Sequence, residues 1–166
     1  LNVLSQNAST VGAIDLKFLN YDENNNFPFF DKLEKNQFDL LYLFSSDNIQ
    51  INKKNEFIVY QGSHGDRGAE IADIILPSPA YTEKNGLYIN LEGRVQQCRK
   101  ASYPTGESLE CLKIFNLILN SLNKESIFDD NNFLKAKTVE KIIDFNGIDK
   151  LPSKKDVNDY IKKESN

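Results

Sequence analysis

The chain has 166 residues, of which 40% are apolar, and it carries a net charge of −4 from 20 basic and 24 acidic side chains. Such a chain is long enough for one domain with a real core, and its negative charge does not favour nucleic acid or an anionic membrane as a partner. No apolar run approaches the roughly 20 residues that cross a bilayer, and we expect no secretory signal because polar residues interrupt Leu1–Leu19.

The N-terminal part predicts short helices and a loop. Apolar residues at helical spacing predict a helix over Asn2–Leu16. The polar, Asn-rich segment Asn20–Asn26 predicts a loop. Phe29–Asn36 then predicts one or two helical turns.

Three short apolar runs follow, and each predicts a strand. Phe38–Phe44 is nearly continuously apolar, as expected of a strand that is buried on both faces of a parallel sheet. Phe57–Tyr60 and Ile74–Leu76 predict the second and third strands. Ala69–Ala72 predicts one helical turn between them, and Pro77 should stop the third strand because it cannot donate a ladder hydrogen bond.

The segment Tyr81–Gln97 predicts a hairpin-like excursion. Apolar and polar residues alternate along it, and Asn85-Gly86 and Glu92-Gly93 supply turns. After it comes the strongest helix signal of the chain, an apolar stripe that ends at Leu122. We expect Glu107 and Glu110 in the first turn of that helix, where acidic residues suit the helix dipole.

The C-terminal tail predicts two short helices. The first covers Phe133–Phe145 and would be capped by Asn146-Gly147. Ser153 with Asp156 predicts the N-terminal cap of the second.

The most informative stretch of the chain is Gln61–Gln97, which reads QGSHGDRGAEIADIILPSPAYTEKNGLYINLEGRVQQ. It resembles the C-terminal, molybdopterin-oxidoreductase-like part of the large iron–sulfur subunit (the 75 kDa type) of NADH:ubiquinone oxidoreductase, respiratory complex I. The pattern of that family is roughly Q-G-x-H-G-D-x-G-A-x-I-A-D-x-I-L-P, then A-Y-T-E-K-x-x-x-Y-x-N-x-E-G-R-x-Q-Q. The matching positions that we take as its structural signature are Gly62, His64, Gly65, Asp66, Gly68, Asp73, Glu83, Asn90, Glu92, Gly93, Arg94 and Gln96.

This resemblance implies an α/β fold with a mainly parallel sheet. It covers roughly residues 1–122, which we expect to form part of a molybdopterin-oxidoreductase-like domain, and leaves 123–166 as a helical tail. It implies a structural role in the peripheral arm of complex I, in support of electron transfer from NADH to ubiquinone, by a chain that is itself non-catalytic. The family's full subunit has an N-terminal ferredoxin-like region with cluster-binding cysteines, so we expect this chain to be the C-terminal part of a split subunit.

The expected cofactors and partners follow from the same resemblance. Iron–sulfur clusters are expected on the polypeptide that carries the N-terminal part of the subunit, and other peripheral-arm subunits are expected as partners. The resemblance places the chain on the matrix side of the mitochondrial inner membrane, or on the cytoplasmic face of a bacterial plasma membrane. Abundant Asn, Lys, Ile and Phe with scarce Arg indicate an AT-rich organellar genome.

The residues themselves favour no metal or redox centre in this chain. A [4Fe–4S] cluster normally uses about four thiolates, whereas the only cysteines are Cys98 and Cys111. We interpret these as two reduced thiols, with a disulfide between them not indicated. His64 with Asp66 could serve as a general base or metal site, but no second His accompanies them, and a loop-shaping hydrogen-bond role is favoured.

The glycines and the hairpin charges allow two further interpretations. Gly62, Gly65 and Gly68 could cradle a phosphate after a strand, but their spacing fits no nucleotide fingerprint, and we favour positive φ or close backbone approach as their purpose. Two acidic residues, Glu83 and Glu92, could do acid–base work. We favour instead a polar network that fixes the hairpin, with Arg94 as its hub and Asn90, Gln96 and Gln97 as members.

Two alternative functions remain open from the sequence. One is a fragment of an active molybdopterin-dependent oxidoreductase, which would need a molybdenum ligand elsewhere. The other is a free-standing nucleotide-binding module. The A-Y-T-E-K and E-G-R-x-Q-Q patterns disfavour the first, and the missing nucleotide fingerprint disfavours the second.

Overall fold

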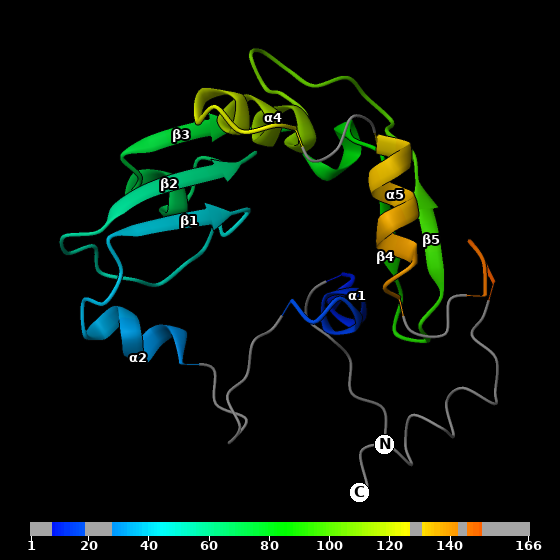
Figure 1. Cartoon of the computed structure of the whole chain (residues 1–166), viewed down its shortest axis with the longest axis horizontal. Coiled ribbons are helices and arrows are strands. Elements are labelled where there is room, and N and C mark those ends of the chain that lie inside the picture. The colour runs from blue at the N-terminus through cyan, green and yellow to red at the C-terminus, as the bar shows by residue number, and fades with distance from the viewer. Residues whose placement is uncertain (1–7, 19–27, 127–130, 143–145, 151–166) are drawn as a thin grey trace, which may run out of the picture. The chain divides into compact units, whose positions relative to one another are not determined.

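The computed structural model describes residues 8–18, 28–126, 131–142 and 146–150 (Figure 1). The chain divides into two compact units. We call the first the hairpin unit, from residues 1–20, 85–99 and 128–166, and the second the sheet unit, from residues 21–84 and 100–127. The predicted domain boundary after residue 122 stays a prediction. No helix within the described ranges is long and apolar enough to span a membrane.

The sheet unit is built on three parallel strands, as predicted. They are β1 (Leu40–Phe44), β2 (Phe57–Gly62) and β3 (Ile74–Pro77), in the order β1-β2-β3. In the register of the sheet, Leu41 lies beside Ile58 and Tyr60 lies beside Ile75. The mixed α/β class with a parallel sheet is therefore confirmed.

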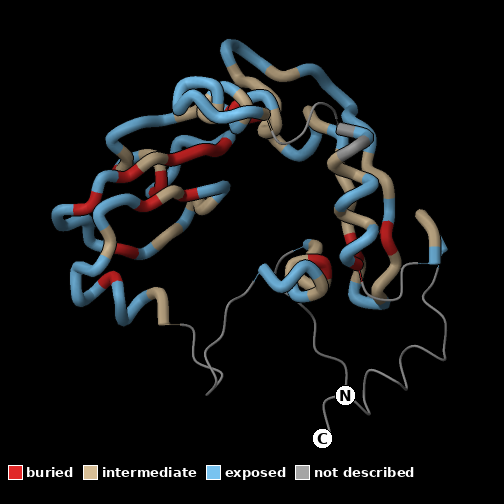
Figure 2. The backbone as a smooth tube through the Cα atoms, in the orientation of Figure 1, coloured by how far each residue is buried: buried red, intermediate tan, exposed pale blue. Residues whose placement is uncertain are grey.

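The main core lies against one face of this sheet. Figure 2 shows in red where buried residues occur along the strands. The inward residues of β1 and β2 pack with Leu33 of α2 (Phe29–Glu34) and with Ile71, which follows α3 (Arg67–Glu70). This packing removes apolar surface from water, which stabilises the fold by about 25 cal/mol for each Å² buried. The buried members are Leu33, Leu41, Leu43, Ile51, Ile58, Tyr60 and Ile71.

The opposite face of the sheet is only partly covered, which corrects the prediction of a strand buried on both faces. Phe115 of α4 (Cys111–Ser121) lies over its carboxyl end, with its ring centroid 5.9 Å from that of Tyr42 and 6.0 Å from that of Phe44. Farther back, Leu40 is 57% exposed, Phe57 45% and Ile74 44%. The alternation of burial along β1 is thus that of a half-covered sheet.

The hairpin unit contains the predicted antiparallel pair, β4 (Gly86–Ile89) and β5 (Val95–Cys98). It also holds α1 (Thr10–Asp15) and α5 (Asn131–Val139). Among its described residues, the buried core members are Ile89, Val95 and Ile142. Gly12 lets α1 approach the hairpin closely, since a Cβ there would lie 3.1 Å from Cδ1 of Ile89.

Several predicted helix bounds are wrong. Within the described part of the predicted Asn2–Leu16 helix, Ser9 has φ 64° and the helix begins only at Thr10. The helix predicted from Glu107 begins at Cys111, so Glu107 is not in its first turn and Glu110 is its N-cap.

Two further bounds differ from the prediction. The turn predicted at Ala69–Ala72 is a helix over Arg67–Glu70. α5 ends at Val139, so Asn146-Gly147 is not its C-cap. The predicted loop at Asn20–Asn26 and the cap at Ser153 lie outside the described residues.

Candidate functional site

The candidate site lies at the carboxyl ends of the parallel strands, the edge where open α/β sheets usually bind ligands. Two loops meet there: residues 45–47 follow β1, and residues 63–66 follow β2. Four of the signature residues that the sequence predicts, Gly62, His64, Gly65 and Asp66, stand in or next to the second loop, and Gly68 follows in α3.

A buried tyrosine joins these two loops. The Tyr60 side chain is 1% exposed, and its hydroxyl donates to the carboxylate of Asp47 and lies 2.9 Å from the backbone carbonyl of His64. Burial, together with the hydrogen bond to Asp47 and its negative charge, raises the pKa of Tyr60 to about 12. The phenol is therefore neutral at physiological pH and acts as a fixed donor, not as a base.

The imidazole of His64 stands at the surface, with its side chain 59% exposed. Its Nδ1 lies 3.0 Å from Oγ of Ser63 and 3.6 Å from Oδ2 of Asp47. Among the described residues, no group of three or more His, Cys, Asp and Glu side chains could hold a metal ion. His64 contributes to the loop through its backbone carbonyl, and the predicted loop-shaping role of its imidazole stays a prediction.

Gly62 and Gly68 serve close approach, whereas Gly65 does not. A Cβ on Gly68 would lie 2.5 Å from the carbonyl oxygen of Ser46, and one on Gly62 would overlap the hydroxyl of Tyr60. A Cβ on Gly65 would meet nothing within 4 Å. None of the three has positive φ, so the prediction that they are needed for positive φ is wrong.

Three N–H groups of α3 that lie next to this edge are bonded within the chain. The N–H of Gly68 donates to the carbonyl of Asp47 at 2.8 Å. The N–H groups of Ala69 and Glu70 donate to the carbonyl of Asp66 at 2.9 and 3.1 Å. Asp47 and Asp66 also place negative charge at this edge, and that charge repels an anion.

Asp73 anchors the third strand to the second. Its Oδ2 accepts the N–H of Ile58 at 2.8 Å, and its Oδ1 lies 2.5 Å from Nζ of Lys53. The hydrogen bond from Ile58 and then that from Lys53 lower the pKa of the Asp73 carboxyl. This signature residue therefore has a structural task in the sheet.

The turn of the hairpin is organised by Asn90 and not by Arg94, which corrects the predicted hub. Oδ1 of Asn90 accepts the N–H of Glu92 at 3.0 Å and that of Arg94 at 2.9 Å. Gly93 has φ 78°, a conformation that glycine adopts at no steric cost. Nε of Arg94 is buried without a hydrogen-bond partner, and in the described part of the chain Arg94 forms no ion pair with Glu92.

The two remaining signature residues, Glu83 and Gln96, belong to different units of the chain. Oε2 of Glu83 accepts the N–H of Ala80 at 3.0 Å and closes a 3₁₀ turn over Tyr81–Glu83 in the sheet unit. Gln96 lies opposite Tyr88 in the hairpin unit and is exposed. Glu83 is therefore not part of the hairpin turn.

Sequence patterns miss the polar residues that hold the candidate site. These patterns mark Asp47 only as a polar residue after a strand and Tyr60 only as an apolar strand residue. In the structure, the Tyr60 hydroxyl donates a hydrogen bond to the Asp47 carboxylate. Gln61 is fully buried and accepts a hydrogen bond from Tyr42. A polar side chain at the end of a buried strand is the signal that could point to Gln61.

A comparison with protein families matches residues 1–121 to the family described as "Molybdopterin oxidoreductase". Among curated proteins, the chain is 45% identical over 129 residues to the NADH-ubiquinone oxidoreductase 75 kDa subunit of Reclinomonas americana, with 77% of this chain and 18% of that protein covered. It is 39% identical over 155 residues to the G subunit of the NADH-quinone oxidoreductase of Rickettsia felis, with 93% of this chain and 22% of that protein covered.

A fungal mitochondrial protein gives a similar match. The chain is 44% identical over 133 residues to the NADH-ubiquinone oxidoreductase 78 kDa subunit of Candida albicans, with 78% of this chain and 17% of that protein covered. The chain thus spans about a fifth of the length of the curated relatives that it matches.

Proposed function

The chain belongs to the molybdopterin oxidoreductase family, in the part that matches the 75 kDa type of NADH oxidoreductase subunit, and from this premise we propose that it is a structural core component of the peripheral arm of respiratory complex I. In this role it supports electron transfer from NADH to ubiquinone without a redox centre of its own and without catalysing a step itself. The relatives that carry this proposal are named as subunits of NADH-oxidising enzymes.

The observation that carries the structural role is the bare face of the parallel sheet. Leu40, Phe57 and Ile74 come from three neighbouring strands and are all about half exposed. Parallel sheets are stable almost only when both faces are covered, and a contiguous apolar patch marks an interaction surface. A further part of the subunit should therefore cover this face.

The absence of a redox centre is part of the proposal, and two features support it. The sheet edge disfavours the phosphate of a molybdopterin, because the carboxylates of Asp47 and Asp66 repel an anion. The space beside Gly62 is also filled by the Tyr60 side chain. The chain has two cysteines, fewer than the roughly four thiolates of a [4Fe–4S] cluster. The same negative charge disfavours a nucleotide-binding module.

We place the clusters on the partner that covers the bare face. That partner is the polypeptide with the N-terminal iron–sulfur part of the subunit, and other peripheral-arm subunits complete the assembly. The site of action is the matrix side of the mitochondrial inner membrane, or the cytoplasmic face of the plasma membrane in a bacterium. Two fungal relatives are named as mitochondrial proteins, which supports this placement.

Co-expression with that partner tests this proposal. We expect the full chain to aggregate when expressed alone and to become soluble and protease-resistant with the partner. Phe57→Asp should abolish co-purification because it places a charge on the bare face. Tyr103→Asp is the matched control, since Tyr103 is an aromatic residue of the same unit that is 78% exposed and lies off the sheet.

Three results would contradict the proposal. A chain that is soluble, monomeric and cooperatively folded alone would show that the sheet needs no cover. Equal loss of co-purification in Phe57→Asp and Tyr103→Asp would show that the bare face has no special part in the contact. Stoichiometric iron or molybdenum in the isolated chain would overturn the absence of a redox centre.

A further inference from the structure

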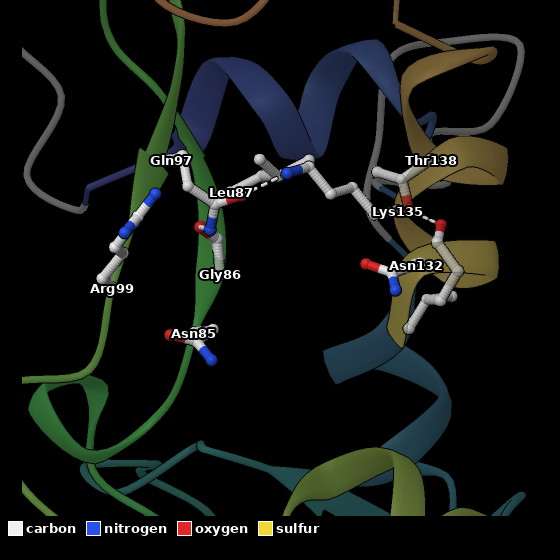
Figure 3. Close-up of a pocket in the computed structure, with 9 residues that line it drawn as sticks. Asn85, Gly86, Leu87, Gln97, Arg99, Asn132, Lys135 and Thr138 are labelled. Atoms are coloured by element: carbon white, nitrogen blue, oxygen red, sulfur yellow. Dashed lines mark hydrogen bonds between the residues drawn. The ribbon is translucent and has the colours of Figure 1, made fainter. Parts of the chain in front are cut away.

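A polar cavity of about 650 Å³ lies within the hairpin unit, between the hairpin and α5 (Figure 3). This volume falls in the range of small-molecule sites, roughly 300–1,000 Å³. Leu87 of β4 and Leu134 of α5 give it apolar walls, and Asn85 and Asn132 add amide groups. It is distant in sequence from the loops of the candidate site and shares no lining residue with them.

Lys135 is held in this cavity by a fixed chain of hydrogen bonds. Figure 3 shows it reaching from α5 toward the hairpin, where its ammonium donates to Oε1 of Gln97. Nε2 of Gln97 in turn donates to the carbonyls of Gly86 at 3.0 Å and Cys98 at 2.8 Å. Gln97 is thereby oriented with its oxygen toward the lysine, and one of the three ammonium donors is used by a neutral acceptor.

The charges of the cavity are unbalanced. Arg99 also lines it, whereas none of the lining residues that the structure describes is Asp or Glu. In the described part of the chain, neither Arg99 nor Lys135 makes an ion pair within 4.0 Å. Two cations with no carboxylate among the described lining residues stand out in a chain whose net charge is −4.

We propose that this cavity binds a small organic anion through a carboxylate or phosphate group. The planar guanidinium of Arg99 can hold two oxygens of such a group, and Lys135 supplies a point charge with free donors. Leu87 and Leu134 contact the carbon skeleton of the ligand. Gln97, from the E-G-R-x-Q-Q pattern, is the positioning residue that keeps Lys135 in the cavity.

Amine labelling of Lys135 tests this site in the purified assembly that contains the full chain. The labelling rate is read by mass spectrometry at constant ionic strength, with inorganic phosphate, AMP or citrate as the probe. We expect at least one probe to slow the labelling of Lys135 in a saturable way. Lys113, an exposed lysine of α4 in the other unit, is the internal control and should label at an unchanged rate.

The three probes separate the two ligand groups. Protection by phosphate and AMP identifies a phosphate site, and protection by citrate alone identifies a carboxylate site. Arg99→Gln should raise the probe concentration needed by about tenfold, which is about 1.4 kcal/mol. Arg99→Lys should restore part of the protection because the charge returns. Arg99 is exposed, so these variants leave the fold intact.

Any of three results would overturn the site. The first is a labelling rate of Lys135 that is the same with all three probes as without them. The second is protection of Lys135 that is matched by protection of Lys113. The third is protection that persists unchanged in Arg99→Gln, which would remove Arg99 from the site.

Discussion

The hydroxyl of Tyr60 donates to the carboxylate of Asp47, and this contact ties the end of β2 to the loop that follows β1. The same loop is tied a second time, because the carbonyl of Asp47 accepts the N–H of Gly68 at 2.8 Å. Asp47 therefore accepts hydrogen bonds from Tyr60, which precedes the Gly-rich loop, and from Gly68, which follows it. These two hydrogen bonds hold the loop after β1 in place from within the chain.

We expect Tyr60→Phe to destabilise the protein by about 1–2 kcal/mol, because a hydrogen bond to a charged group is lost from a buried side chain. Urea unfolding of the protein, with its partner where one keeps it soluble, measures the change. Tyr103→Phe is the control, since Tyr103 is 78% exposed and should change stability by less than about 0.5 kcal/mol.

The same pair predicts a dependence on alkaline pH. The pKa of Tyr60 is raised in the folded state from the ordinary 10.0 to about 12. Its contribution to stability is therefore complete below about pH 10 and is lost as pH rises toward 12. The stability advantage of the wild type over Tyr60→Phe should shrink across that interval. An advantage that stays constant from about pH 9 to about 12 would contradict the contact.

A matched pair of glycine substitutions tests the packing of the loop. Gly68→Ala places a Cβ 2.5 Å from the carbonyl oxygen of Ser46 and 3.0 Å from the Tyr60 ring, so backbone must shift. We expect a loss of about 2 kcal/mol or more, as for other overpacked sites. Gly65→Ala meets nothing within 4 Å and has no positive φ to lose. It should be neutral or stabilising by about 0.4–1 kcal/mol, because it restricts the unfolded chain.

Thermal unfolding of the two variants side by side decides this prediction. Equal effects would show that Gly68 has more room than the contacts with Ser46 and Tyr60 allow. The pair also separates packing from ligand binding, since a phosphate cradle would make both glycines sensitive in a ligand-dependent way.

His64→Ala should leave NADH oxidation by the assembled complex largely unchanged. The imidazole is exposed, and the oxygen of His64 that lies 2.9 Å from the Tyr60 hydroxyl belongs to the backbone, which alanine retains. The measurement is turnover per assembled complex, with complex abundance determined separately. Asp47→Ala is the contrast, because it removes the acceptor of the Tyr60 hydroxyl and should reduce abundance. A large fall in turnover for His64→Ala at normal abundance would assign the imidazole a part in catalysis.

The parallel strands and the hairpin could be predicted because their signals are local. Apolar runs of strand length mark Leu40–Phe44 and Phe57–Gly62, and Gly93 marks the turn of the hairpin. The apolar runs by themselves do not show which face of the sheet is bare, because an apolar run has the same pattern whether its cover is present or supplied by a partner. The contact between Tyr60 and Asp47 joins two loops and depends on the strand register, which no local pattern contains.

The predicted hub at Arg94 is wrong for a related reason. Opposite charges close in sequence favour an ion pair between Arg94 and Glu92, but the turn bends so that backbone N–H groups face Asn90 instead. An Asx side chain competes well for such groups because its oxygen is already beside them. The charged residues are easier to notice in the sequence, but the side-chain amide of Asn90 makes the hydrogen bonds that hold the turn.

The last prediction therefore concerns Asn90 and Arg94. Asn90→Ala removes the acceptor of two backbone N–H groups, at 3.0 and 2.9 Å, and should cost about 1–2 kcal/mol. Asn90→Asp keeps the accepting oxygen but replaces the Nδ2 that lies 3.4 Å from Oε2 of Glu92 with a second oxygen, so it should recover only part of this loss. Arg94→Ala should cost less than Asn90→Ala, because it leaves no carboxylate of Glu92 without a partner. Urea unfolding of the three variants ranks them, and a larger loss for Arg94→Ala would restore the arginine as the hub of the turn.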